Sequence, residues 1–356
     1  MRRSWQVATL ALAAGLSGVL ILMAAAPAAD KAAPPAGPAA APAPSGPSLA
    51  AESAGGESFR FCVMGDVRAN VALFDEQVLA AVAKQYGSLG VFGISVGDDE
   101  LAAEVRARID ARFGPETIWY HGMGNHEAGV PACMQWLRDD YNTGHGGRAA
   151  FKTHTNQDGP AGSVETTYSW DYGDVHFVML NEYWNDAAAP GSDAATSGDA
   201  VPALVAWLDR DLQRNKRPVV MVVGHEPAYP QGPRHTDDSL NANVEQRDAF
   251  WKVLEKHGVQ AYFCGHTHYY SRYRPDGGQV WQIDVGNAGN QPDVKKDGTL
   301  TVAPDKREGL TFVNVVVTPA EIRYETWRNQ GGKTFSRADS WTQPVKTKAP
   351  ATAAGR

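Results

Sequence analysis

From residue 59 onward, short apolar runs alternate with segments in which apolar residues recur every three or four positions. The short runs are rich in β-branched and aromatic residues, as strands are, and the longer segments have the spacing of amphipathic helices. This alternation predicts an α/β fold in which helices cover β-sheets. The predicted strands are 59–64, 90–96, 117–121, 167–170, 176–180, 218–223, 259–264, 280–285, 311–317 and 322–327. The predicted helices are 71–86, 101–113, 202–215 and 244–257.

Local signals support two helix ends and two loops. Asn70 precedes the helix 71–86 as an N-cap, and Gly258 follows the helix 244–257 as a C′ residue. The stretches 142–165 and 286–310 are polar and rich in glycine. We expect them to be loops near a site or on its rim.

The N-terminal 57 residues follow a different pattern. Two arginines precede an apolar run from residue 7 to 26, and small residues follow it, which predicts an export signal over 1–28. An uncleaved membrane anchor is the alternative, because a bilayer crossing needs about 20 apolar residues. Residues 29–57 consist mainly of Ala, Pro, Gly and Ser and predict a disordered linker. The expected division is therefore 1–28 signal or anchor, 29–57 linker, 58–330 folded domain and 331–356 C-terminal tail.

Composition narrows the class of protein. With 356 residues, 43% of them hydrophobic, the chain can form one large core. The 33 Lys and Arg against 40 Asp and Glu give a net charge of −7, and no basic block is present, so nucleic acid is not an expected partner. Cys62 and Cys264 lie in apolar runs and Cys133 completes an odd set, which predicts free buried thiols.

Five polar segments share one design, because each directly follows an apolar run and combines Gly with Asp, Asn or His. Each alone is compatible with ordinary turn chemistry. Their joint order and spacing is what indicates a site, since ligands gather beyond the carboxyl ends of strands in α/β sheets. The segments are Gly65-Asp66-Val67-Arg68, Gly97-Asp98-Asp99, Gly124-Asn125-His126-Glu127, Gly224-His225-Glu226-Pro227 and Gly265-His266-Thr267-His268.

The residue types in these segments favour metal ions. Carboxylates, an amide oxygen and imidazoles without clustered thiolates suit Mn, Fe, Zn, Ni or Co. Two such ions about 3.5–4 Å apart need a bridging carboxylate, for which Asp98 is the natural candidate.

With these motifs the chain resembles the calcineurin-like metallophosphoesterases, a superfamily that includes purple acid phosphatases, Ser/Thr phosphatases and cyclic-nucleotide diesterases. The resemblance spans residues 59–327 and includes the segment 168–173 before a strand. It implies two mixed β-sheets packed as a sandwich flanked by helices, with a dinuclear metal site at one edge.

The resemblance also implies roles for individual residues. His126 matches the histidine that contacts the substrate phosphate and acts as general acid, and Glu127 would orient it through a hydrogen bond. The implied ligands are Asp98, Asn125, His225 and His266 for the second metal, with Asp98 bridging, and Asp66, Asp98 and His268 for the first.

One residue departs from the family pattern. Most members have Asp-x-His in the first motif, whereas here the third residue is Arg68, whose guanidinium cannot bind a metal. Purple acid phosphatases compensate with a tyrosine three residues after the bridging aspartate, but here that position is Leu101. The first metal site therefore lacks one ligand.

Three arrangements fit this departure. Water could complete the first site, Asp99 or Glu100 could replace the missing ligand, or one metal could suffice with Arg68 supplying the other positive charge. We favour the first, with Arg68 binding a substrate phosphate oxygen in bidentate fashion. The alternatives are an ion pair of Arg68 with a nearby carboxylate such as Asp99, and ordinary solvated acids before a helix for Asp99 and Glu100.

The sequence thus predicts an exported hydrolase, periplasmic or secreted, that cleaves a small phosphate monoester by attack of metal-bound hydroxide. Arg68 and His126 would bind the substrate and act on it. The segment 224–230 resembles the acid-phosphatase branch and favours a monoester. A phosphodiesterase, or a protein that binds metal or phosphate without turnover, is the alternative. Membrane contact is expected only through an uncleaved N-terminal segment. His235 follows the fourth motif closely enough to face the substrate.

Overall fold

The computed structural model describes residues 57–100, 102–143, 155–186, 197–232, 235, 237–289, 309–329 and 333–345. The predicted export signal and all of the predicted linker except its last residue lie outside these ranges. Among the helices in the described ranges, none combines the length and the apolar character needed to cross a membrane.

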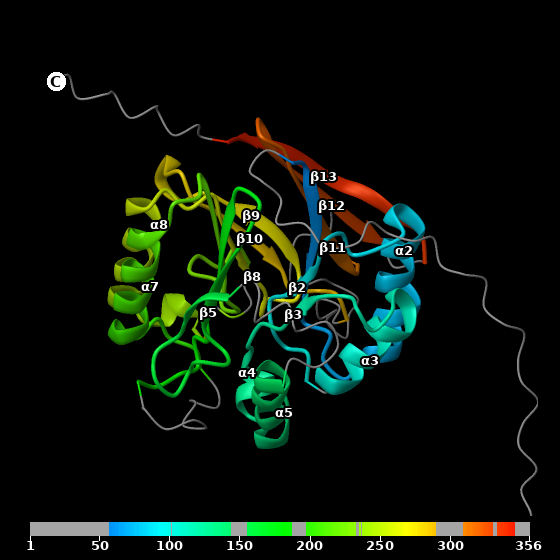
Figure 1. The fold of residues 1–356 in the computed structure, drawn as a ribbon, viewed down its shortest axis with the longest axis horizontal. Coiled ribbons are helices and arrows are strands. Elements are labelled where there is room, and N and C mark those ends of the chain that lie inside the picture. Colours follow the sequence, from blue (N-terminus) through cyan, green and yellow to red (C-terminus); the bar gives the residue numbers. More distant parts are fainter. Residues whose placement is uncertain are drawn as a thin grey trace, which may run out of the picture. The chain divides into compact units, whose positions relative to one another are not determined.

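Two mixed β-sheets form the framework and pack against each other through a shared core, with helices on their outer faces, which confirms the predicted fold class (Figure 1). In the first sheet, β1, β2 and β3 run parallel, and the other neighbours are antiparallel. Its strand order is β13 (Phe335–Pro344), β12 (Glu321–Asn329), β11 (Thr311–Val317), β1 (Phe59–Met64), β2 (Gly93–Ser95) and β3 (Trp119–Tyr120).

The second sheet has a parallel centre, β6, β7, β8 and β10, flanked by antiparallel strands. Its order is β4 (Thr155–Asp158), β5 (Tyr168–Tyr172), β6 (Val175–Met179), β7 (Val219–Val223), β8 (Ala261–Cys264), β10 (Trp281–Val285) and β9 (Tyr270–Tyr273). Parallel neighbours matter here because their carboxyl ends meet at one edge.

The period of two in the strands divides their side chains between two environments. In β1, Phe61 and Val63 belong to the core between the sheets, whereas Cys62 and Met64 pack toward the helices on the outer face. Phe61 meets Phe177 of the opposite sheet edge to face, with ring centroids 5.2 Å apart. All three cysteines are buried and free, as predicted.

Helices cover the outer faces. The first sheet packs against α1 (Val71–Leu73), the π-helical segment η1 (Phe74–Leu79), α2 (Ala80–Tyr86) and α3 (Ala102–Phe113). The second packs against α7 (Pro202–Arg214) and α8 (Val244–Lys256), which lie together in Figure 1. Asn70 stands at the predicted N-cap but makes no side-chain cap bond, and Gly258 has φ 64°, as its predicted C′ role requires.

Among the described residues, two helices and three strands were not predicted from the sequence. The first of the helices begins inside the third motif and the second comes after it, and the strands β4, β9 and β13 lie at sheet edges. β4 is entirely polar, so it carries no apolar pattern, and β13 lies in the segment expected to be a C-terminal tail. The helices are α4 (Asn125–Ala128) and α5 (Pro131–Thr143), and two short 3₁₀ turns are η2 (Leu240–Ala242) and η3 (Pro275–Gly277).

Candidate metal centre

The five polar motifs follow strands of both sheets. Asp66, Asp98 and Asn125 come after β1, β2 and β3 of the first sheet, and His225 and His266 come after β7 and β8 of the second. Backbone hydrogen bonds join neighbouring motifs within each sheet. The amide of Asp66 donates to the carbonyl of residue 97 at 2.9 Å, and the amide of residue 265 donates to the carbonyl of His225 at 2.7 Å.

Several of the predicted ligands converge. One donor atom from each of Asp66, Asp98 and His225 lies within 4.8 Å of the others, and all three residues are buried. His225 Nε2 is 3.5 Å from Asp98 Oδ1, and His268 Nε2 is 3.4 Å from Asp66 Oδ1. The rings of His225 and His266 have centroids 5.2 Å apart. These are contacts from which a metal ion could draw ligands after small side-chain movements.

Hydrogen bonds fix which nitrogen of each imidazole is available. His225 Nδ1 lies 2.7 Å from the carbonyl of Val96, and His266 Nε2 lies 3.0 Å from the carbonyl of Asp238. A carbonyl only accepts, so these nitrogens carry the protons, and His225 Nε2 and His266 Nδ1 are the nitrogens that could bind a metal ion. Burial lowers the pKa of His225 to about 4, so its ring is neutral at pH 7. For His266, burial acts to lower the pKa. The hydrogen bond with Asp238 and the nearby carboxylates act more strongly in the opposite direction, so the pKa is raised overall.

Buried ligand-type atoms without hydrogen-bond partners show that the residues fit a cation. Asp66 Oδ1, Asp98 Oδ2, Asn125 Oδ1 and His225 Nε2 are all buried and make no hydrogen bond. Buried polar atoms in folded proteins almost always have a partner. Burial raises the pKa of Asp66 well above its usual range, and the charge of Asp98 adds to this effect. A bound cation would supply the missing partner and offset the neighbouring negative charges.

The backbone at these motifs is strained. Asp66, Arg68, Asp98, His266 and His268 have φ between 54° and 69°, a region that L-residues rarely adopt. Each such residue costs about 1–3 kcal/mol and persists only where the surrounding structure enforces it. Strain of this kind gathers at functional sites, and here it turns the side chains that follow the strands toward one place.

Glycine at position 124 permits the close approach of two motifs. A Cβ atom there would lie 2.2 Å from Asp98 Oδ1 and 2.5 Å from the Asp98 amide. The φ of Gly124 is −120°, which any residue can adopt, so it is the lack of a side chain that matters. The third motif therefore requires glycine at this position, because any side chain would collide with Asp98.

The carboxylate of Glu127 does not take the place expected for it. Its Oε2 accepts hydrogen bonds from the amides of Asp98 at 2.9 Å and Gly124 at 2.8 Å. The carboxylate beside Nδ1 of His126 is that of Glu100, at 2.5 Å. Glu127 thus joins the second and third motifs, because the backbone amides of both motifs donate to its one buried carboxylate.

Arg68 and His126 both face Asp98. Arg68 Nη1 lies 3.5 Å and His126 Nε2 lies 3.9 Å from Asp98 Oδ2. Each of the two side chains is about a quarter exposed, so both can reach a molecule bound at the site. Arg68 forms its ion pairs with Asp98 and Glu100, whereas Asp99, which we had considered as its partner, is buried at 1% exposure.

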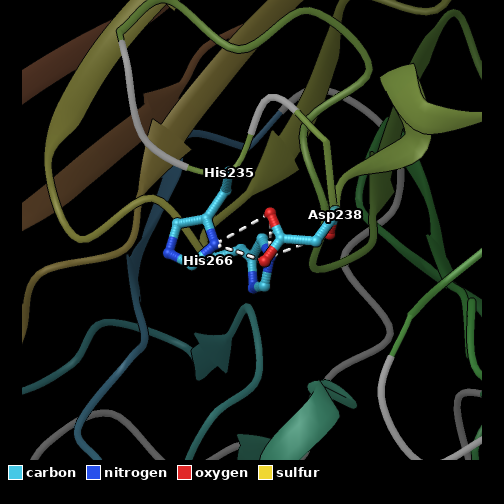
Figure 2. A group of neighbouring side chains, drawn as sticks. All are labelled: His235, Asp238 and His266. Carbon is cyan, nitrogen blue, oxygen red and sulfur yellow. Dashed lines mark hydrogen bonds and ion pairs between the residues drawn. The ribbon is translucent and has the colours of Figure 1, made fainter.

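Two further residues join the site from the loop before α8. Figure 2 shows the carboxylate of Asp238 facing the rings of His235 and His266. His235 Nδ1 is 3.0 Å from Asp238 Oδ2, and the His235 and His266 rings are 4.0 Å apart. One donor from each of the three lies within 4.8 Å of the others, so this group could also hold a cation. However, the hydrogen bond of His266 Nε2 to the Asp238 carbonyl favours a role in orienting His266. Asp238 has no motif in the sequence that could have revealed it.

Comparison with known proteins agrees with the fold and the motifs. The family model "Calcineurin-like phosphoesterase" matches residues 61–270. An acid phosphatase of Aspergillus ficuum is 29% identical over 142 residues, which cover 31% of this chain and 22% of that protein. Purple acid phosphatase 21 of Arabidopsis thaliana is 29% identical over 133 residues, covering 35% of this chain and 27% of its own length. This chain thus aligns with about a quarter of the length of each of these two relatives.

Among solved structures, the purple acid phosphatase PPD1 from yellow lupin (Lupinus luteus) seeds superimposes with a TM-score of 0.53 at 14% identity. The match covers 81% of this chain and 54% of that one. At that identity the match shows a shared fold. The likeness in sequence to the two acid phosphatases named above agrees with the predicted branch of the superfamily. The chain belongs to the calcineurin-like phosphoesterase family, a family of phosphoric ester hydrolases.

Proposed function

We propose that the chain is an exported, metal-dependent phosphoesterase that hydrolyses a phosphate monoester. The observation that carries this proposal is the buried group of Asp66, Asp98 and His225, whose donor atoms lie within 4.8 Å of one another and include atoms without hydrogen-bond partners. Two side chains suited to phosphate chemistry, Arg68 and His126, contact the same Asp98 carboxylate.

The ligands would be divided between two ions. Asp98, Asn125, His225 and His266 would hold the second ion, and Asp66, Asp98 and His268 would hold the first with the help of water. When bound, such ions polarise a phosphoryl oxygen and lower the pKa of water toward neutrality. Mn, Fe, Zn, Ni and Co all suit these carboxylate, amide and imidazole donors.

The remaining residues act on the substrate. The Arg68 guanidinium carries charge at any physiological pH and can donate two parallel hydrogen bonds to phosphate oxygens. His126 presents Nε2 toward Asp98, where it can give a proton to the departing oxygen of the ester. His235, beside the ring of His266, is placed to contact the substrate as well.

A single set of assays tests this function. The purified protein is loaded with Mn, Fe, Zn, Ni or Co, its metal content per chain is measured, and p-nitrophenyl phosphate is compared with bis(p-nitrophenyl) phosphate. We expect metal-dependent turnover with preference for the monoester, and a loss of about 100-fold or more in kcat/KM for Asp98→Asn. Glu104→Gln, an exposed residue of α3, serves as the matched control.

Two other results would redirect the proposal. Preference for the diester would assign a phosphodiesterase to the same site. Metal or phosphate binding without turnover of any ester would assign a binding protein, in which the Arg68 guanidinium, 3.5 Å from Asp98 Oδ2, substitutes for the first ion.

Export is the remaining part of the proposal and has its own test. The full chain is expressed in a Gram-negative host, the cell is fractionated and the intact mass of the protein is determined. We expect a periplasmic or secreted protein that lacks its first 28 residues or so, as the signal pattern requires. Full-length protein retained in the cytoplasm would contradict export, and full-length protein in the membrane fraction would indicate the anchor.

A further inference from the structure

The carboxylate of Glu100 links the two side chains proposed to act on the substrate. Its Oε2 lies 2.5 Å from His126 Nδ1 and 3.5 Å from Arg68 Nε. The opposite ends of both side chains face the metal centre, since Arg68 Nη1 and His126 Nε2 approach Asp98 Oδ2. One carboxylate oxygen therefore contacts one edge of each group, and the other edge of each group faces Asp98, where a substrate would bind.

The path of the chain after β2 places Glu100 there. Asp98 has φ 58° and points into the site, the following Asp99 is buried at 1% exposure, and Glu100 returns to the rim with a quarter of its side chain exposed. The amide of Arg68 donates to the carbonyl of Asp98 at 2.9 Å, so the two loops that carry Arg68 and Glu100 are joined through their backbones.

We propose that Glu100 is a positioning residue that holds His126 in one orientation as the proton donor to the leaving group and steadies Arg68 beside it. This inference rests on the proposed function of the site. A carboxylate accepts hydrogen bonds, so a proton on Nδ1 of His126 would face Glu100 at this distance, with Nε2 directed inward. Without this contact, the ring could turn about its side-chain bonds and present either nitrogen.

The proton transfer that this arrangement serves is balanced within the site. As the bond between phosphorus and the departing oxygen breaks, its electron pair stays on that oxygen. The proton on Nε2 of the imidazolium moves to the oxygen. The ring becomes neutral and keeps the proton on Nδ1, which faces the Glu100 carboxylate. Glu127 does not take this place, because its Oε2 accepts from two backbone amides and the ring contacts of His126 among the described residues are with Glu100 and Asp98.

The dependence on the leaving group tests the proposal. Phenyl phosphate has a poor leaving group that needs a proton, whereas p-nitrophenyl phosphate has a good one that needs it less. For Glu100→Gln we expect kcat on phenyl phosphate to fall about 10- to 100-fold, and on p-nitrophenyl phosphate by only about 3-fold. Glu104→Gln, which removes an exposed carboxylate four residues further along, should leave both unchanged. An equal loss on the two esters would overturn the proposal.

A double-mutant cycle asks whether Glu100 acts through His126. If it does, Glu100→Gln should slow phenyl phosphate hydrolysis strongly in the parent protein, and by less than about 2-fold in a His126→Ala background. Equal losses in the two backgrounds would show that Glu100 acts independently of His126, against the proposal.

A measurement without turnover separates this proposal from the proposed function. The ¹⁵N NMR spectrum of the histidine rings is recorded for the full chain, with His126 assigned by its absence in His126→Ala. We expect a proton on Nδ1 of His126 in the parent protein and a mixture of tautomers in Glu100→Gln. The same His126 signals in both proteins would refute the positioning role even if no ester proves to be a substrate. A parent protein with the expected signals but no activity would refute only the proposed function.

Discussion

Arg68 gives this site its individual character. It departs from the Asp-x-His pattern that the first motif otherwise resembles, and its φ of 54° shows that the loop holds it in a strained conformation. Its guanidinium contacts Asp98 and Glu100 at 3.5 Å each. A surface residue without a function rarely combines a strained backbone with two acidic partners. This placement suits a guanidinium that binds phosphate oxygens.

Replacement of Arg68 distinguishes a substrate contact from a lost ligand. Arg68→Ala should lower kcat/KM about 10- to 100-fold, mainly through a higher KM, because a charged hydrogen bond contributes about 1.5–3 kcal/mol. The metal content per chain should not change. Steady-state kinetics and elemental analysis of the same preparation check both quantities.

Arg68→His completes the comparison, because it restores the residue type that the family most often has. We expect a rate below that of the parent protein. A variant that binds more metal and also turns over faster would instead identify Arg68 as a ligand that this chain has lost.

At the level of single residues, the sequence predicted the meeting of Asp66, Asp98 and His225, whose spacing after strands is distinctive. Their role as ligands stays a prediction. The contacts of Glu100 and Asp238 could not be predicted, because they depend on how two irregular loops pass each other. Glu127 illustrates the same limit, since its partners are backbone amides brought close by a turn and not a side chain recognisable by type.

Among the elements, the turn between β3 and α4 is the most constrained part of the site. A methyl group on Gly124 would have to displace Asp98, because the added carbon would lie 2.2 Å from its Oδ1. The strand β3 itself has only two residues, so the turn has little regular structure to absorb the movement.

Gly124→Ala should therefore reduce activity far more than stability. We expect a loss of about 10- to 100-fold in kcat/KM, comparable to the loss of a residue that orients a metal ligand. Gly114→Ala is the matched control, since its φ is 95° and an added Cβ meets nothing within 4 Å. That variant should lose about 1–2 kcal/mol of unfolding free energy and keep its activity. Activity and denaturant unfolding of both variants decide the matter, and equal activities would refute the crowding argument.

The central strands of both sheets were predicted because their apolar runs are long and bounded by glycine. The edge strands β4, β9 and β13 were harder, since half or more of each is exposed or polar and packing against a neighbour decides their conformation. In β13, the residues after Phe335 are mostly exposed, so its pairing with β12 depends on a partner that the sequence pattern does not reveal. Likewise α4 begins at Asn125 inside the third motif, and α5 begins at Pro131 shortly after α4 ends.

For the molecule as a whole, a buried histidine far along the second sheet couples stability to pH. His176 on β6 lies 2.7 Å from Asp171 on β5 and 2.9 Å from Asp211 on α7. Burial alone would lower the pKa of His176, but the two carboxylates outweigh burial and raise it from 6.5 to about 9. The protonated ring thus joins two strands and the helix that covers them.

The sign of the resulting pH dependence follows from the direction of that shift. The folded state holds this proton more tightly than the unfolded chain, so the stabilisation is complete below pH 6.5 and is lost as the pH rises to about 9. In metal-free protein the unfolding free energy should decline by up to about 3 kcal/mol over this interval through His176 alone. Urea unfolding of the parent and of His176→Gln at several pH values measures the difference. A constant difference would exclude His176 as its source.

The division of the proposed ligands between the two sheets has a mechanical consequence. Asp66, Asp98 and Asn125 belong to one sheet, and His225, His266 and His268 to the other, so an ion that binds them all would act as a cross-link between the halves of the sandwich. The affinity of the protein for this ion would then depend on how well the two sheets are aligned. Phe61→Leu, which loosens the aromatic contact with Phe177 deep in the core, should weaken metal binding in calorimetric titrations although it touches no ligand. Changes that loosen the packing between the sheets would therefore also weaken metal binding and lower the activity that depends on it.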